Sequence, residues 1–263
     1  MAYYTGDQKL PPLGALCVDY TEDIHRPPGD VIMSHSYKFP VIHQTVESAT
    51  LWNVVRPTAF ENDYVQKYVD ACRKLEEKGC IGIITSCGFL AQLQQVISAQ
   101  INIPIATSSL LQIPYVLAIT SPKKRVAVLT FDSSALSSTH FKGVGVTEDM
   151  MERVVIKGCL PGMPLHNVIT NGDPYIAEDI EKELVQLAED LTIEHTDIGA
   201  FVLECTNMPP YSKAIQERVK LPVFDGVTMV NWFYSGLYAK SMPPDTSKEE
   251  GRRRRLRSEK ELR

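Results

Sequence analysis

The sequence predicts an α/β protein made of two similar lobes that face each other across a cleft. Along most of the 263 residues, apolar strand-like runs alternate with helix-like segments, which is typical of parallel α/β architecture. A repeat supports the two lobes: Cys87 precedes Pro104 by 17 positions, as Cys205 precedes Pro222, with a helix-like segment between them in both copies. We therefore expect two pseudo-symmetric Rossmann-like lobes with parallel sheets and an active site in the cleft between them.

Hydrophobic periodicity sets the expected elements. Apolar runs without alternation favour buried strands, and apolar residues at helical spacing favour helices. In the first half these patterns predict strands at 13–18, 80–85 and 103–106, with helices at 60–78 and 89–98. In the second half they predict strands at 125–130, 199–204 and 221–224, with helices from about 134 and at 175–194, 207–218 and 227–238.

The repeat also predicts how the chain is divided between the lobes. We expect residues 1–120 and 221–240 to form the first lobe, with Cys87, and residues 121–220 to form the second, with Cys205. Residues 241–263 differ in character, because prolines, serines and a run of arginines replace the apolar pattern. We expect this basic segment to be a disordered tail, with a nucleic-acid or nuclear-import segment as the alternative.

Composition and charge argue against several classes of protein. The net charge is −5, and because the residues from Asp245 onward are basic, the body is more acidic still, which disfavours a nucleic-acid-binding face. The start MAYYTGDQKL lacks the apolar core of a secretory signal, and the most apolar stretch, 110–119, is too short to span a bilayer. We therefore expect a soluble, cytoplasmic protein with no nucleic-acid or membrane partner.

Two of the six cysteines are candidate reactive groups. No C-x-x-C motif is present, so the sequence predicts free thiols and neither a metal site nor a redox pair. Four cysteines are typical of core residues. Cys87 and Cys205 differ, because each follows a strand at the start of the next helix, at equivalent points of the repeat. We expect the helix N-terminus beside each thiol to lower its pKa and so favour the reactive thiolate.

Polar residues at other strand ends are candidate substrate ligands, because ligands bind beyond the carboxyl ends of the strands in open α/β sheets. Hydroxyl and backbone N–H groups at helix starts could hold a carboxylate, although capping is the ordinary role of such residues. The candidates are Asp19, Tyr20, Gly88, Phe89, Ser108, Thr130, Ser133, Thr206 and Asn207. Glu204 precedes Cys205 on a strand, so we expect its side chain to point to the opposite face and to have a structural role.

The motifs TSCGFL and LECTNMPPY, at this two-lobed spacing, resemble the aspartate/glutamate racemase superfamily, and RPPGD at 26–30 does so too. That superfamily contains glutamate, aspartate and hydantoin racemases, maleate isomerase and the algal dimethylsulfoniopropionate lyases. The resemblance covers residues 13–240 and implies a cofactor-independent enzyme that forms homo-oligomers. It also implies that Cys87 and Cys205 flank the carbon next to the carboxylate of a small substrate, where they remove or deliver a proton.

One departure from the racemases bears on the step after proton abstraction. They usually follow the first cysteine with Asn-Thr, which grips polar groups of the substrate, whereas here Gly88 and Phe89 follow Cys87. Glycine allows close backbone approach, and the aromatic ring could pack on a cation such as a sulfonium. We therefore predict a lyase that cleaves dimethylsulfoniopropionate to acrylate and dimethyl sulfide, ahead of an amino-acid racemase and of a non-catalytic binding protein on the same scaffold. The sequence does not say which cysteine is the base.

Overall fold

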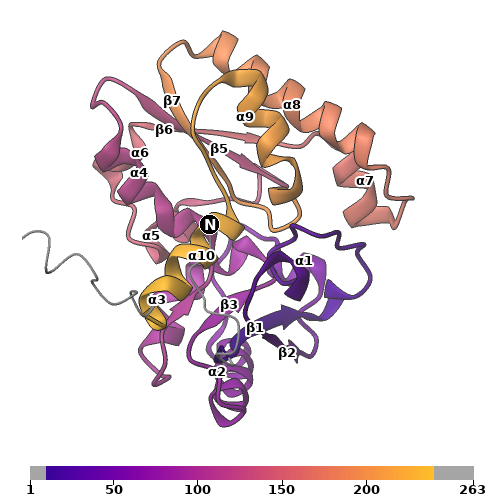
Figure 1. The fold of residues 1–263 in the computed structure, drawn as a ribbon, viewed down its shortest axis with the longest axis vertical. Coiled ribbons are helices and arrows are strands. Elements are labelled where there is room, and N and C mark those ends of the chain that lie inside the picture. Colours follow the sequence, from indigo (N-terminus) through magenta and orange to yellow (C-terminus); the bar gives the residue numbers. More distant parts are fainter. Residues whose placement is uncertain (1–9, 240–263) are drawn as a thin grey trace, which may run out of the picture.

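The computed structural model describes residues 10–239 and confirms the α/β class (Figure 1). This part of the chain forms two four-stranded sheets in which all paired strands are parallel. The first sheet has the order β2-β1-β3-β4, with β1 at Leu13–Val18, β2 at Val41–Val46, β3 at Ile83–Thr85 and β4 at Ile105–Ala106. The second has the order β6-β5-β7-β8, with β5 at Arg125–Thr130, β6 at Val154–Gly158, β7 at Ile198–Leu203 and β8 at Val223–Phe224.

The repeat predicted from the sequence is therefore a structural repeat. In each sheet the strand before the cysteine pairs with the first strand of its lobe on one side and with the strand after the proline on the other. The carbonyls of Pro104 and Pro222 accept hydrogen bonds from the backbone N–H groups of Ile83 and Phe201, at 2.9 Å in both lobes. The two strands that lead to the cysteines thus occupy equivalent positions.

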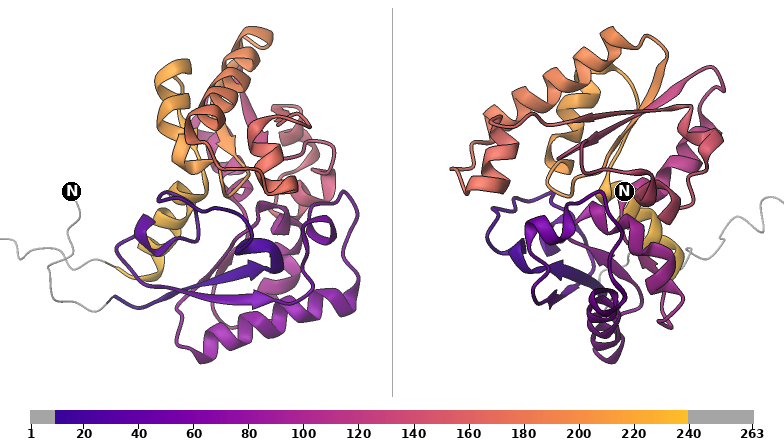
Figure 2. Two further views of the ribbon diagram at one scale, coloured as in Figure 1. Left: turned by 90° about the vertical axis from the view of Figure 1, so that its right-hand side faces the viewer. Right: turned by 180° about the vertical axis from the view of Figure 1, so that it is seen from behind.

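Helices cover the faces of both sheets (Figures 1 and 2). The α-helices are α1 (Leu51–Val54), α2 (Asn62–Glu77), α3 (Gln94–Ser98), α4 (Ile113–Ile119), α5 (Ser138–Gly143), α6 (Glu148–Met151), α7 (Pro164–Asn171), α8 (Ala177–Glu194), α9 (Ser212–Val219) and α10 (Gly226–Leu237). Short 3₁₀ helices are η1 (Asp19–Thr21), η2 (Ser34–Ser36), η3 (Gly88–Leu93), η4 (Ser109–Gln112) and η5 (Pro209–Tyr211). Within residues 10–239, no helix has the length and apolar character needed to cross a bilayer.

Several helices begin later than the periodicity predicts. The segment after Cys87 opens with six residues of 3₁₀ helix before α3, and α9 begins at Ser212 because Pro209 and Pro210 interrupt the run from 207. The segment after β5 first makes a turn in which the Asp132 carboxylate accepts hydrogen bonds from the backbone of Ser134, so α5 begins only at Ser138.

Two strands and four α-helices were not predicted from the sequence. Strand β2 has the sequence VIHQTV and is half-exposed, because it lies at an edge of its sheet. Strand β6 lies at the equivalent edge of the second sheet. Edge strands bury only part of their surface, so they lack the continuous apolar run that identifies a central parallel strand. The helices that were not predicted are α1, α4, α6 and α7.

The lobes exchange their last helices, which shifts the expected boundaries. Strand β8 pairs with β7, so residues 223–224 belong to the second sheet and not to the first lobe. Helix α10 then crosses back, and its Met229, Val230 and Tyr234 pack in the core of the first lobe beside Leu13 and Ala15. Helix α4, in turn, follows the first sheet but packs against β5 of the second. The expected basic tail, 241–263, lies outside the described residues.

Candidate active site between the lobes

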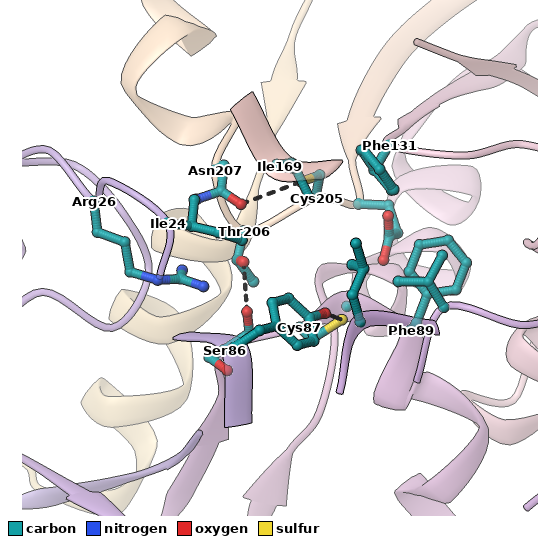
Figure 3. Close-up of a pocket in the computed structure, with 15 residues that line it drawn as sticks. Ile24, Arg26, Ser86, Cys87, Phe89, Phe131, Ile169, Cys205, Thr206 and Asn207 are labelled. Atoms are coloured by element: carbon teal, nitrogen blue, oxygen red, sulfur yellow. Dashed lines mark hydrogen bonds between the residues drawn. The ribbon is translucent and has the colours of Figure 1, made fainter. Parts of the chain in front are cut away.

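Cys87 and Cys205 line one pocket between the two lobes (Figure 3). Cys87 lies two residues beyond β3 and caps η3, whereas Cys205 lies two residues beyond β7. Because the carboxyl ends of both sheets meet at the cleft, the two thiols reach the pocket from opposite lobes. Both cysteines are buried, each with 8% of its surface exposed.

The pocket is narrow and mostly apolar. Its apolar and aromatic lining consists of Tyr20, Ile24, Leu51, Val55, Phe89, Phe131 and Ile169. Among the described residues that line it, Arg26 is the one permanent cation and Glu204 is the one carboxylate. The free volume is about 20 Å³, which is room for about one water molecule. A substrate therefore requires the walls to move apart before it enters.

Cys87 accepts a hydrogen bond from the pocket wall. The Tyr20 hydroxyl lies 3.4 Å from Cys87 Sγ and donates to it. Burial raises the pKa of the Cys87 thiol to about 12, with the nearby Glu204 carboxylate adding to the rise, while the hydrogen bonds from Tyr20 and the Phe89 backbone oppose it. The expected lowering of the pKa at a helix N-terminus is thus wrong, because the cost of burying a thiolate outweighs the helix start.

Cys205 has a different partner. Its thiol donates to Asn207 Oδ1, with the sulfur and oxygen 3.7 Å apart. Burial raises the pKa of Cys205 well above its usual value, and Glu204 raises it further. A thiol that donates is held in its protonated form, whereas a sulfur that accepts is favoured as the thiolate. The hydrogen bonds therefore favour the thiolate form at Cys87 and the protonated thiol at Cys205.

Glu204 lines the pocket, contrary to the expected opposite face. Strand β7 ends at Leu203, so the alternation of a strand no longer directs the side chain of residue 204. Glu204 Oε2 accepts a hydrogen bond from the Thr130 hydroxyl at 2.7 Å, while the buried Oε1 has no hydrogen-bond partner among the described residues. Burial raises the pKa of this carboxyl to about 7, although the hydrogen bonds from Thr130 and the Phe131 backbone act in the opposite direction.

Arg26 is held at the pocket by a buried network that joins the lobes. Its Nη1 donates to both carboxylate oxygens of Asp30, at 3.1 and 3.2 Å, and its Nε donates to the Thr21 carbonyl. Asp30 is fully buried and also accepts from Asn207 Nδ2 of the second lobe at 3.1 Å. Figure 3 shows the guanidinium directed into the pocket from the first lobe. A second link runs from the Thr206 hydroxyl to the Ser86 carbonyl, at 2.7 Å.

Five of the nine candidate substrate ligands line the pocket with the two cysteines. They are Tyr20, Gly88, Phe89, Thr206 and Asn207. The remaining four candidates do not line it. Asp19 accepts a hydrogen bond from the Ser48 backbone, Ser108 caps η4, Thr130 supports Glu204 from behind, and Ser133 is exposed.

Sequence reasoning missed part of the lining. Besides Glu204, it assigned no role to Arg26 or Ser86, and it did not find the apolar residues Ile24, Leu51, Val55, Phe131 and Ile169. The RPPGD motif that begins at Arg26 was a signal for that residue. The apolar residues carry no such signal, because in sequence they are indistinguishable from core.

Solved structures share the two-lobed fold of this chain. Arylmalonate decarboxylase matches with a TM-score of 0.53 at 15% identity, covering 89% of this chain and 96% of that one. A glutamate racemase from Bacillus anthracis matches with a TM-score of 0.54 at 13% identity, covering 88% and 82%. The fold expected from the resemblance to the aspartate/glutamate racemase superfamily is thereby confirmed.

Sequence similarity links the chain to dimethylsulfoniopropionate lyases. The chain is 32% identical over 234 residues to dimethylsulfoniopropionate lyase 3 of Emiliania huxleyi (strain CCMP1516). The match covers 86% of this chain and 60% of that lyase, so the chain spans three fifths of the length of this relative. No protein-family model matches the chain.

Proposed function

We propose that this protein is a dimethylsulfoniopropionate lyase that needs no cofactor and uses a cysteine as its base. The observation that carries the proposal is the buried pocket in which Cys87, with its hydrogen bond from Tyr20, and Cys205 face each other beside Arg26. The relatives with that activity supply the substrate. Arg26 is suited to a carboxylate because its guanidinium already faces the pocket and is oriented by Asp30.

The proposed reaction is a β-elimination. The Cys87 thiolate takes the proton from the carbon next to the carboxylate, and the electrons of that C–H bond form the carbon–carbon double bond. The bond from the β-carbon to sulfur breaks, and its electron pair leaves on sulfur as neutral dimethyl sulfide. Acrylate and the Cys87 thiol remain. The hydrogen bond from Tyr20 stabilises the thiolate before abstraction, and Cys205 stays protonated on its bond to Asn207.

Racemisation of an amino acid is the alternative for the same pocket. Two thiols from opposite lobes could remove a proton from one face of a carbon and return one to the other, and a glutamate racemase shares the fold. Against it, Gly88 and Phe89 offer no side-chain hydrogen bond to an α-ammonium group. The lyase therefore remains the better-supported function.

Product analysis with matched cysteine variants tests the proposal. The protein is incubated with dimethylsulfoniopropionate, and dimethyl sulfide in the headspace and acrylate in solution are measured. In parallel, loss of optical rotation is followed with L-aspartate and L-glutamate. We expect equimolar sulfide and acrylate, a loss of at least about 10³-fold in kcat for Cys87→Ser, and near-normal kcat for Cys72→Ser, a buried cysteine of α2 outside the pocket. Racemisation without sulfide release would overturn the lyase.

A homo-oligomer in the cytoplasm is also part of the proposal. A broad apolar groove, lined partly by the edge strands β4 and β8, leaves Tyr115 60% and Trp232 76% exposed, and exposed patches of this kind mark association surfaces. All six cysteines are unpaired, as is typical of a reducing compartment. Sedimentation velocity of the wild type and Trp232→Arg tests the homo-oligomer, and a monomeric wild type contradicts it. Cell fractionation tests the cytoplasmic location.

A further inference from the structure

Glu204 carries a charge that the pocket itself does not balance. Its Oε1 is buried and has no hydrogen-bond partner among the described residues, although its Oε2 is anchored by Thr130. Burying an unpaired carboxylate oxygen is costly, so such an atom is retained where something else satisfies it. The residue is only 1% exposed yet lines the cavity, so the missing partner would come from whatever enters that cavity.

The proposed reaction makes this imbalance larger. When the Cys87 thiolate and a substrate carboxylate are both present, three negative groups share the pocket with Arg26, and Arg26 is already paired with Asp30. Like charges in a site that excludes water disfavour each other strongly. A substrate with a net negative charge, such as aspartate or glutamate, would add to that repulsion. A substrate that carries its own cation would relieve it.

We infer that Glu204 binds the onium group of a zwitterionic substrate while Arg26 holds its carboxylate, and that Glu204 thereby selects substrates with a cation on the β-carbon. This inference rests on the proposed function and adds a residue that determines specificity. A sulfonium has no N–H to donate, so it is recognised by charge and by aromatic faces and not by hydrogen bonds. The rings of Phe89, Phe131 and Tyr20 line the same pocket as Glu204.

The local backbone explains how Glu204 reaches this position. A Cβ at residue 88 would lie 2.2 Å from Glu204 Oε1 and 2.4 Å from the Glu204 carbonyl, so only glycine leaves space for the carboxylate there. Oε1 therefore lies against the residue that directly follows Cys87. A cation held by Oε1 would sit near the proposed base, as the leaving group of a β-elimination must, since the two reacting bonds share one short carbon chain.

The test compares an onium ligand with a thioether that lacks the cation, on the wild type and Glu204→Gln, at pH 8, where the glutamate is ionised. The onium ligand is the zwitterion 3-(trimethylammonio)propionate and the thioether is the anion 3-(methylthio)propionate, and their dissociation constants are measured by calorimetry alongside KM for dimethylsulfoniopropionate. We expect Glu204→Gln to weaken the onium ligand, and to raise KM, by about tenfold or more, while the thioether ligand, which loses its repulsion from Glu204, binds no more weakly than to the wild type.

Glu183→Gln is the matched control. Glu183 is also a buried glutamate with an unpartnered Oε1, and its Oε2 accepts from the Leu165 backbone, but it does not line the pocket. Its substitution should leave both dissociation constants unchanged. Equal weakening of both ligands in Glu204→Gln would overturn the inference. So would a wild type that binds the thioether ligand as tightly as the onium ligand, a result that needs no folded variant.

The outcomes also separate this inference from the proposed function. Absence of dimethyl sulfide release by the wild type, with onium binding that still depends on Glu204, would remove the lyase and leave the onium site. Sulfide release with an unchanged KM in Glu204→Gln would remove the onium site and leave the lyase.

Discussion

At the scale of single residues, the pocket places two thiols beside a carboxylate that raises the pKa of both. Glu204 raises the pKa of both Cys87 and Cys205, and burial raises all three. Burial in one pocket therefore disfavours the charged form of each of the three groups. Positive charge that enters the pocket would favour the thiolate and the carboxylate.

Glu204 makes the stability of the protein depend on pH in a predictable direction. Its pKa is about 7 in the folded protein and 4.5 in the reference state, so between these values the folded state binds more protons and its stability falls as pH rises. Above pH 7 the cost is fully present and amounts to about 3 kcal/mol. Glu204→Gln removes this titration, so its free energy of unfolding should exceed that of the wild type by up to that amount at pH 8 and by much less at pH 5.

Urea unfolding of both proteins at pH 5 and pH 8 measures this difference. The groups that face Glu204 are Cys87, Cys205, Tyr20 and Arg26, and burial raises the pKa of both thiols and of Tyr20 far above the window. His166, which stacks on Phe131, is present in both proteins and cancels in the comparison. A difference that is the same at both pH values would contradict the assignment to Glu204.

At the scale of elements, the junction between β3 and η3 is the tightest point of the site. Gly88 has extended neighbours on one side and a 3₁₀ helix on the other, and Glu204 of the opposite lobe fills the space beside its Cα. The sequence singled out this glycine as a departure from the racemases, and the packing against Glu204 supplies a physical reason for it.

Gly88→Ala should therefore be destabilising even though alanine suits a helix. Its Cβ would overlap the Glu204 carboxylate and backbone, and overpacking of this kind costs about 1–3 kcal/mol. Gly236→Ala in the last turn of α10 is the control, because nothing lies within 4 Å of the position of its Cβ and alanine is a better helix former than glycine. Thermal unfolding should show a lower Tm for Gly88→Ala and an equal or higher Tm for Gly236→Ala. Equal Tm values for Gly88→Ala and the wild type would exclude the clash.

At the scale of the whole molecule, the lobes are joined by exchanged helices and by hydrogen bonds across the cleft. Helix α10 packs in the first lobe although it follows the last strand of the second, and α4 contacts β5 after leaving the first sheet. Between them, the Asn207 amide donates to Asp30 and the Ser109 hydroxyl donates to the Leu203 carbonyl. Opening the pocket to a substrate must strain or break contacts of this set.

Among the residues that make these contacts between the lobes, Asp30 is the one whose substitution should lower the free energy of unfolding most. Removing one partner of a buried ion pair leaves an uncompensated charge and costs about 3–5 kcal/mol, and the Arg26 and Asp30 side chains are only 6% and 0% exposed. Asp30→Ala should lower the free energy of unfolding by that amount in urea titrations. Asp197→Ala, which breaks the partly exposed pair with Arg125, should cost much less. Comparable losses in the two variants would show that the Asp30 network does not hold the lobes.

The sequence by itself determined the α/β class, the internal repeat and the two cysteines. Each of these is encoded locally: central parallel strands are continuous apolar runs, and Cys87 and Cys205 stand at fixed offsets from Pro104 and Pro222. It also placed Tyr20, which lies directly after the first strand and whose hydroxyl reaches Cys87.

Only the tertiary structure decided which polar residues share the pocket and how strongly their pKa values change. Glu204 turns toward the cleft because its strand has ended, and Arg26 is aimed by Asp30 and by an amide of the other lobe. The thiol pKa values rise instead of falling because burial is produced by segments far apart in the chain. Charge balance and desolvation depend on those distant neighbours, which no local pattern of residues encodes.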